Sequence, residues 1–271
     1  MNELEHRMVQ QLVDLRDNHH VVGVKAEFEA EGTRLEEALR LKEVISVAGL
    51  GLTIKVGGCE ALRDMYESRV IGVDRIVGPM VESPWALHKF VEACKMAYPE
   101  EERDTVKFAV NIETVTGVES FAAMLDLPDV ANLDGIVLGR VDMSGSMGLT
   151  REDINSEAVY AVAERVFVQA KTRGLECALG GGVSADSLPF MRRLPVGCLD
   201  RYETRKVIFS CPEGLGEDAD KGILKAVGFE LMWLKNKRDF YGRIFEEDRA
   251  RIQMLQSRYD RLIEQAGGLY G

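Results

Sequence analysis

The feature that most constrains this fold is an alternation that begins after His20. Short apolar runs are separated by longer amphipathic segments, such as 33–49 and 84–97. The apolar runs lie at 21–29, 52–58, 75–81, 106–114, 133–140, 176–182 and 198–210. Continuous apolar strands joined by amphipathic helices are typical of repeated βα units around a parallel sheet. The pattern therefore predicts an α/β protein built on a parallel sheet.

We expect a (β/α)8 TIM-type barrel rather than an open, doubly wound sheet. Seven strands within residues 21–210 suit a compact barrel, and no G-x-G-x-x-G motif follows the first strand, as a dinucleotide-binding sheet would require. The eighth strand has two possible locations. It is either the second half of the 198–210 run or a short piece near the N-terminus.

Both ends of the chain are predicted to be helical. Residues 3–17 form an amphipathic helix, and 218–266 carry apolar stripes at helical spacing, which is more helix than a final barrel unit needs. We expect 1–215 to hold the barrel with its N-terminal helix. Residues 216–271 would then be a helical extension that packs on the barrel or on a neighbouring subunit. A homo-oligomer that assembles through the C-terminal helices is the expected state.

Composition excludes several classes of protein. A net charge of −11 and a pI near 5.0 argue against a nucleic-acid partner, because phosphate binding needs clustered Lys and Arg. The five cysteines form no CxxC pairs, which favours reduced thiols in the cytoplasm. The N-terminal segment is charged throughout, and no apolar run reaches the roughly 18 residues of a membrane span. We therefore expect a cytoplasmic protein with no membrane partner.

Polar residues gather where the predicted strands end. In a parallel barrel the carboxyl ends of the strands line the active site. The polar residues at or near these ends are Lys25, Glu27, Glu29, Glu31, Lys55, Glu82, Asn111, Glu113, Arg140, Asp142, Arg201, Glu203 and Arg205. An unpaired buried carboxylate is costly. Several acids and several cations at one end of a barrel therefore indicate a site for a metal and an anion.

Glu113 and Asp142 are the predicted metal ligands. Each stands at the end of one of two consecutive strands, so the fold would bring them side by side. Two hard oxygen ligands suit Mg²⁺ or Mn²⁺, whereas zinc usually takes His or Cys, and the four histidines have no ligand spacing. In the alternative interpretation, Glu113 pairs with a strand-end cation and Asp142 caps a turn.

The stretch IET…GVES…DLPDVANLDGIVLGRVDMSGSMG resembles the HpcH/HpaI aldolase/citrate lyase family, which includes citrate lyase β-like proteins of the phosphoenolpyruvate/pyruvate superfamily. In that family an I-E-T block and a G-x-x-D block supply the metal carboxylates, and Glu113 and Asp142 stand at those positions. GVDRIVGPMVES (72–83) resembles the preceding strand, and the likeness spans 21–185. The resemblance implies a Mg²⁺ or Mn²⁺ ion chelated by a 2-oxo acid such as pyruvate or oxaloacetate, which stabilises an enolate.

The chain departs from the family at two positions. The family's substrate-binding arginine is replaced by Lys55, which offers a point charge instead of a fork, or a Schiff base if its pKa is lowered. The family's Glu-His step on an early strand is replaced by Glu27-Phe28. Either Lys25, Glu27 or Glu29 then takes over proton transfer, or the reaction is not a retro-aldol of that kind. These acids could also lie on a solvated loop.

The remaining predicted site residues would bind the substrate's anionic groups. Arg201, Glu203 and Arg205 alternate along the last run, so on one strand they would face one side and hold a distal carboxylate or phosphate. The resemblance assigns Gly139 and Arg140 to the loop whose backbone N–H groups meet the substrate carboxylate. The expected substrate-binding residues are Lys55, Gly139, Arg140, Arg201, Arg205 and Glu82. For the arginines, ion pairs on the protein surface are the alternative.

We therefore expect a metal-dependent carbon–carbon lyase of the class II aldolase type that acts on a small 2-oxo acid, with Lys25, Glu27, Lys55 and Arg140 as candidate catalytic residues. One alternative is a CoA-thioester lyase of the citrate lyase β/malyl-CoA type, although no surface for the nucleotide is identifiable. Another is a non-catalytic barrel that serves as an assembly module, which an absence of metal binding would favour.

Overall fold

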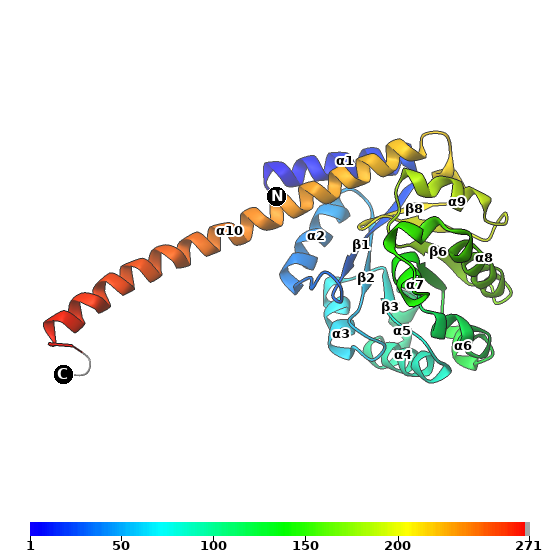
Figure 1. Ribbon diagram of the computed structural model, residues 1–271, viewed down its shortest axis with the longest axis horizontal. Helices are drawn as coiled ribbons and strands as arrows, with labels where there is room; N and C mark the ends of the chain where they lie inside the picture. Colours follow the sequence, from blue (N-terminus) through cyan, green and yellow to red (C-terminus); the bar gives the residue numbers. More distant parts are fainter. Residues whose placement is uncertain (269–271) are drawn as a thin grey trace. The chain divides into compact units, whose positions relative to one another are not determined.

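The computed structural model describes residues 1–268 and contains a closed barrel of eight strands in the order β1 to β8 (Figure 1). The strands are β1 (Val21–Glu27), β2 (Gly51–Lys55), β3 (Arg75–Gly78), β4 (Lys107–Ile112), β5 (Gly135–Gly139), β6 (Glu176–Gly180), β7 (Arg201–Glu203) and β8 (Val207–Ser210). The α-helices are α1 (Glu3–His19), α2 (Leu35–Val47), α3 (Leu62–Ile71), α4 (Pro84–Ala97), α5 (Glu100–Arg103), α6 (Val115–Leu125), α7 (Arg140–Ser146), α8 (Glu157–Lys171), α9 (Leu188–Arg193) and α10 (Ala219–Gln265). The predicted barrel, with an N-terminal helix and a long C-terminal helix, is confirmed.

The last strand departs from the regular βα repeat. Strands β1 to β7 run parallel, but β8 pairs antiparallel with both β7 and β1. A tight turn at 204–206 joins β7 to β8, and the Thr204 N–H donates to the Val207 carbonyl over 2.9 Å. Of the two expected locations for the eighth strand, the second half of the 198–210 run is therefore confirmed. A hairpin replaces the final crossover helix.

The interior of the barrel is apolar on one side and polar on the other. Strands β3 to β6 each contribute one member of a buried cluster formed by Val77, Ala109, Val137 and Ala178. In the strand register Val77 stands beside Lys55, and Lys55 stands beside Glu27. Since laterally paired residues point to the same face of a sheet, the inward positions of β1 and β2 at this level carry charges.

Two helices close the outside of the barrel beside β1 and β8. Helix α1 begins at an Asn2–Glu5 capping box and buries Met8, Leu12 and Leu15. Its side chain Asp14 pairs with Lys225 of α10 over 2.5 Å. Up to Glu230, α10 buries Ile223, Ala226 and Phe229 against this part of the protein.

The chain divides into two compact units. The first is Met1–Glu230 and contains the barrel, α1 and the first turns of α10. The second unit begins at Leu231 and is helical through Gln265. No helix within residues 1–268 is long and apolar enough to cross a membrane.

Candidate functional site

Glu113 lies immediately beyond the carboxyl end of β4 and is almost fully buried. Its carboxylate accepts hydrogen bonds from Asn111 Nδ2 at 2.7 Å and from the Met80 N–H at 3.2 Å, and Lys55 Nζ lies 3.6 Å away. Met80 has a φ of +48°, a strained conformation that brings its amide to the carboxylate. Burial raises the pKa of Glu113, although Lys55 and the two hydrogen bonds counteract it.

Asp142 follows the next strand, in the first turn of α7, and is exposed. Because β4 and β5 are neighbouring parallel strands, Glu113 and Asp142 follow the same end of adjacent strands, and the charge of Asp142 is the smallest of the causes of the raised pKa of Glu113. Gly139 ends β5 beside Glu113, and a Cβ at this position would lie 2.5 Å from Glu113 Oε2. The absence of a side chain at Gly139 thus leaves room for the Glu113 carboxylate beside α7. The structure brings together the two predicted metal ligands.

The residues at this position fit a hard divalent cation. Besides the two carboxylates, Asn111 presents a buried Oδ1 atom with no hydrogen-bond partner. All three groups are oxygen donors, as Mg²⁺ and Mn²⁺ prefer. Within residues 1–268, no group of three or more His, Cys, Asp or Glu side chains is placed to hold a metal. A cation here would thus rely on two carboxylates, with water or substrate as further ligands.

Lys55 ends β2 with its ammonium between two acids. Its Nζ lies 3.0 Å from Glu29 Oε2 and 3.6 Å from Glu113 Oε1. Burial favours the neutral amine, but Glu113, Glu29 and Glu27 together outweigh it and raise the pKa of Lys55 above its ordinary value. The side chain is therefore a cation at neutral pH. This protonation state suits binding of a carboxylate and does not suit Schiff-base formation, which needs a lowered pKa.

Lys25 forms a second charged group inside the barrel. Its Nζ lies 2.6 Å from Glu203 Oε1 of β7 and 3.2 Å from Glu27 Oε1. Despite its burial the two acids raise the pKa of Lys25, and the pKa of Glu27 is lowered by Lys25 and Lys55, against the opposing effect of burial. Both groups are therefore charged at neutral pH.

The two charged groups together carry an excess of negative charge. Their members are Lys25, Lys55, Glu27, Glu29, Glu113 and Glu203. When all are ionised, four carboxylates face two ammonium groups. An added divalent cation would offset this excess.

Arg140 is fully buried and directed away from the two carboxylates. Its guanidinium donates to the Gly180 carbonyl at 3.3 Å, to Ser187 Oγ at 3.1 Å and to Asn155 Oδ1. Because these partners are neutral, burial lowers the pKa of Arg140 to about 10. The predicted roles of its side chain, at the protein surface or in the anion site, are replaced by a structural one. It ties the start of α7 to the segment after β6.

The segment that contains this site is similar to a known protein family. The sequence profile of the HpcH/HpaI aldolase/citrate lyase family matches residues 56–184, from the end of β2 to just beyond β6. Residues 56–184 of the barrel are therefore similar to this family. This match confirms the resemblance that the I-E-T and G-x-x-D blocks indicated, and it contains Glu113, Gly139 and Asp142. No curated protein sequence matches the chain.

Solved structures of HpcH/HpaI proteins share the fold. An HpcH/HpaI aldolase from Desulfitobacterium hafniense DCB-2 has a TM-score of 0.58 at 15% identity, and the match covers 73% of this chain and 82% of that one. The citrate synthase SbnG has a TM-score of 0.57 at 17% identity, with 86% and 90% covered. A family protein from Burkholderia cenocepacia J2315 reaches 0.53 at 15% identity, with 68% and 89% covered. Such low identities establish the fold alone.

Arg201 and Arg205 do not lie beside Glu113 and Asp142. Arg201 is the first residue of β7 and therefore lies at the amino end of the barrel, where its guanidinium stands 3.4 Å from Glu176. Arg75 and Lys107 bind the same carboxylate. Burial alone would raise the pKa of Glu176, but these cations lower it to about 2. The expectation that Arg201 lies beside the predicted metal ligands is therefore wrong.

Arg205 lies in the β7–β8 turn and not on a strand. Its Nε donates to Glu31 Oε1 at 3.1 Å, and Glu31 also binds the buried Lys206 at 2.6 Å. The expected Arg–Glu–Arg network therefore does not form, since Glu203 binds Lys25 instead. Glu82 lies just beyond β3 and accepts a 2.6 Å hydrogen bond from Thr114 Oγ1, at the first turn of α6.

Sequence reasoning missed Lys206, Arg75 and Glu176 as members of buried charge clusters. The only available signal was a charged residue within or beside a short apolar run, which does not reveal the end of the barrel at which the charge lies.

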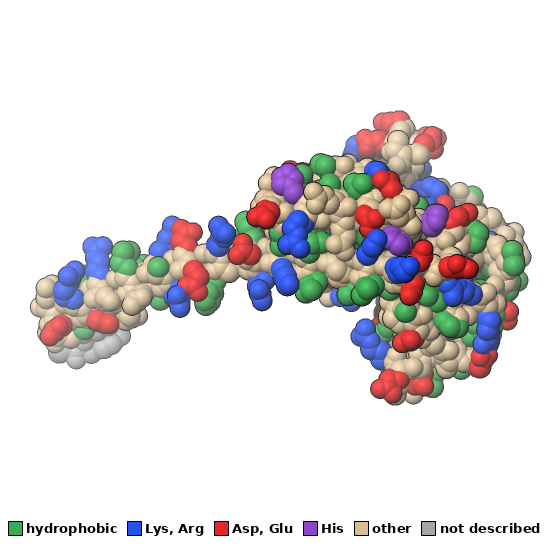
Figure 2. All heavy atoms as spheres, turned by 90° about the horizontal axis from the view of Figure 1, so that it is seen from above, with side chains coloured by type: hydrophobic (Ala, Val, Ile, Leu, Met, Phe, Trp, Pro, Cys, Tyr) green, Lys and Arg blue, Asp and Glu red, His purple; other side chains and the backbone are tan. Residues whose placement is uncertain are grey.

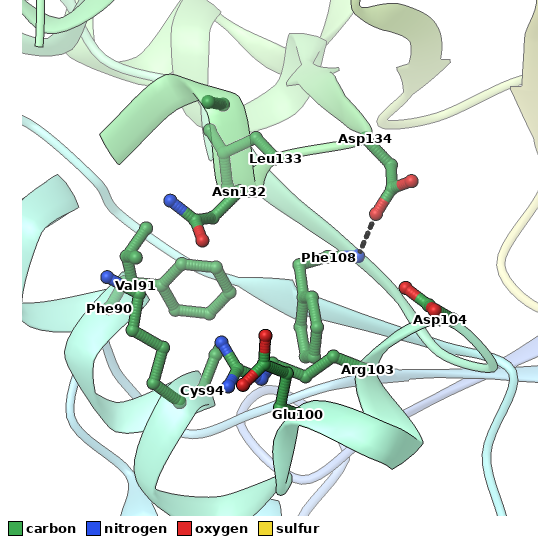
Figure 3. A pocket seen from close by; sticks show the side chains of 12 residues that line it. Phe90, Val91, Cys94, Glu100, Arg103, Asp104, Phe108, Asn132, Leu133 and Asp134 are labelled. Atoms are coloured by element: carbon green, nitrogen blue, oxygen red, sulfur yellow. Dashed lines mark hydrogen bonds between the residues drawn. The ribbon is translucent and has the colours of Figure 1, made fainter. Parts of the chain in front are cut away.

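A cavity of about 310 Å³ lies elsewhere, between α4, α5 and the start of β4 (Figure 3). Its lining includes Cys94, Arg103, Phe108 and Asn132. The Phe108 N–H donates to Asp134 over 2.7 Å beside it. Because Phe108 is the second residue of β4, this cavity is at the amino end of that strand, the opposite end from Glu113.

Proposed function

We propose that this chain is a metal-dependent carbon–carbon lyase of the class II aldolase type, which acts on a 2-oxo acid such as pyruvate or oxaloacetate through an enolate. One observation carries the proposal. Glu113 and Asp142 lie together at the carboxyl ends of β4 and β5, inside the family-matched segment, with the ammonium of Lys55 beside Glu113.

Glu113 and Asp142 would hold Mg²⁺ or Mn²⁺, which when bound supplies a Lewis acid for a developing enolate. Lys55 adds a fixed positive charge. Because its side chain is largely buried, with an exposed fraction of 9%, its field is weakly screened by water. We assign to Lys55 the recognition of a substrate carboxylate, where it would stand in for the family's arginine with a single contact instead of a fork.

Proton transfer requires a group other than the family's histidine, which is Phe28 here. Lys25 stays protonated between Glu27 and Glu203, and the lowered pKa of Glu27 makes that carboxylate a weak base. Glu29 is more accessible than Glu27 and contacts Lys55 over 3.0 Å. We therefore assign proton transfer to Glu29. Lys25 and Glu27 would position Lys55 and set the charge around it.

Calorimetric titration of Mg²⁺ and Mn²⁺ into chelator-treated protein, with and without oxalate as a mimic of the pyruvate enolate, tests the proposal. We expect metal binding that tightens when oxalate is present. Asp142→Asn should abolish this behaviour and leave the fold intact, whereas Asp186→Asn, which changes an exposed acid elsewhere, should not. Absence of metal binding by the unmodified protein would overturn the proposal and favour a non-catalytic barrel.

Substrate kinetics separate the aldolase from a CoA-thioester lyase with the same metal ligands. Saturation by a free 2-oxo acid supports the aldolase. Turnover only with an acyl-CoA thioester would replace it with the lyase.

A further inference from the structure

The second unit carries a heptad repeat of apolar side chains, which are exposed except for the half-buried Tyr241. The repeat consists of positions separated alternately by three and four residues. Its apolar members are Leu231, Leu234, Tyr241, Phe245, Ile252, Leu255, Tyr259 and Leu262, and the charged residues Arg238 and Asp248 occupy the two remaining positions. Exposed fractions reach 51% at Leu231, 65% at Phe245 and 66% at Ile252. Figure 2 shows hydrophobic side chains at the surface of α10 among charged ones. A heptad stripe of this kind is the seam of a coiled coil.

Two positions of the seam carry opposite charges. Arg238 occupies an a position and Asp248 a d position, where apolar residues normally stand. Among the ion pairs formed within residues 1–268, none includes either side chain. Burying each charge in a seam against apolar residues would be strongly unfavourable. A helix that covers this stripe would therefore have to supply the opposite charge at both positions.

We propose that the second unit pairs with the same unit of a second copy as an antiparallel coiled coil, with the twofold axis beside Arg243. Antiparallel packing sets each a position against a d position of the partner. With this axis, Arg238 faces the partner's Asp248, and by symmetry the pair occurs twice. The apolar layers match as well: Leu231 faces the partner's Leu255, Leu234 the partner's Ile252, and Tyr241 the partner's Phe245.

Other arrangements leave the charges unmatched. A parallel pair in register sets Arg238 against Arg238 and Asp248 against Asp248, which is repulsive. An antiparallel pair shifted by one heptad buries each charge against an apolar residue. The chosen axis also explains an exposed apolar residue beside the seam. Ile244 is 44% exposed, and at the crossing it would meet its own copy, as would Gly242.

Two of the cations that flank the seam form ion pairs within their own helix. Arg251 pairs with Glu247 at 2.5 Å, and Arg249 pairs with Glu246. The repulsion that these two cations would cause between two copies is therefore reduced. The proposal does not depend on the proposed catalytic function.

Sedimentation equilibrium of full-length variants tests both association and register. We expect the unmodified protein to be a dimer or an even multiple of it. Arg238→Asp or Asp248→Arg alone creates two like-charged layers and should raise the dissociation constant at least ~100-fold. The double variant exchanges the charges and should restore association to within about tenfold. Arg243→Asp and Asp239→Arg make matched charge changes off the seam and should leave association unchanged.

A monomeric unmodified protein, single variants that associate normally, or a double variant that stays dissociated would each overturn the proposal. Circular dichroism and thermal melting of each variant show whether the barrel is intact. If a variant unfolds, a distance measurement decides the orientation. Spin labels introduced at Ser257 of both copies should lie about 42 Å apart along the helices, since each is 14 residues from the axis at about 1.5 Å per residue. A separation near 20 Å, roughly two helix diameters, would indicate a parallel pair and overturn the proposal.

Discussion

Gly139 and Glu113 fit against each other so closely that β5 cannot carry a side chain at this position. A Cβ on Gly139 would lie 2.5 Å from Glu113 Oε2 and 3.2 Å from Glu113 Cβ. The backbone of Gly139, with a φ of −88°, is accessible to any residue. The requirement for glycine is therefore space for the Glu113 carboxylate and not backbone conformation.

Gly139→Ala should displace the Glu113 carboxylate and weaken Mg²⁺ binding at least ~10-fold, because metal sites lose affinity when a ligand is misplaced. Gly145→Ala is the matched control, since a Cβ there would have nothing within 4 Å. Calorimetric titration measures both variants. Unchanged affinity in Gly139→Ala would mean that Glu113 is not a ligand or that it moves freely.

Glu113→Gln should raise the melting temperature of the metal-free protein at pH 7. Burial raises the pKa of Glu113, so the folded state prefers the protonated form. The stabilising contribution is complete below the ordinary pKa and is lost as pH rises through the raised value. A neutral glutamine removes this loss. Calorimetry should also show that the difference in melting temperature between variant and parent is smaller at pH 4 than at pH 7. A variant that melts below its parent at pH 7 would contradict the raised pKa of Glu113.

Lys25→Met should destabilise the barrel by about 3–5 kcal/mol, since it leaves Glu27 and Glu203 buried without their cation. Lys225→Met removes an ion pair with Asp14 whose side chains are 40% and 39% exposed, and should cost less than about 1 kcal/mol. Denaturant unfolding at pH 7 measures both. The pKa of Glu27 is lowered, so the stability gained from its pairing is present at neutral pH and lost as pH falls through that lowered value.

Lys55 should bind the substrate as a cation and form no imine. Its raised pKa keeps the amine protonated at neutral pH. Borohydride treatment with pyruvate should therefore leave the protein mass unchanged. Lys55→Met should weaken oxalate binding to the metal-loaded protein by about 10–100-fold, the range lost with one charge-assisted contact. A reduced pyruvate adduct that disappears in Lys55→Met would establish the alternative, Schiff-base chemistry.

Most of the barrel could be predicted because β1 to β6 are continuous apolar runs separated by amphipathic helices. The reversal at 204–206 could not. The turn Thr204-Arg205-Lys206 contains none of the Gly, Pro, Asn or Asp residues that mark hairpins. Alternation also continues across it, so the pattern allowed a second strand within 198–210 but did not locate the turn.

The same limit applies to the site. The placement of Glu113 and Asp142 at neighbouring strand ends could be predicted, because both residues follow strands that are consecutive in a parallel barrel. Arg201 could not be located, since alternation indicates the face of a strand and not the end of the barrel. Arg140 illustrates a different limit. Its partners Gly180, Asn155 and Ser187 come from distant loops that carry no sequence signal.

The reversed β8 also bears on how the ring of strands closes during folding. β8 reaches β1 already joined to β7 by a local turn, and hairpins of this kind form within about 1–10 μs. The pairing of Val21 and Val24 with Phe209 and Val207 is the sheet's longest-range contact. In a regular barrel the seventh and eighth strands are each joined by a separate crossover segment, and each pairing closes a separate long loop. Here the local turn already links β7 to β8, so one long-range pairing, that of β8 with β1, closes the ring.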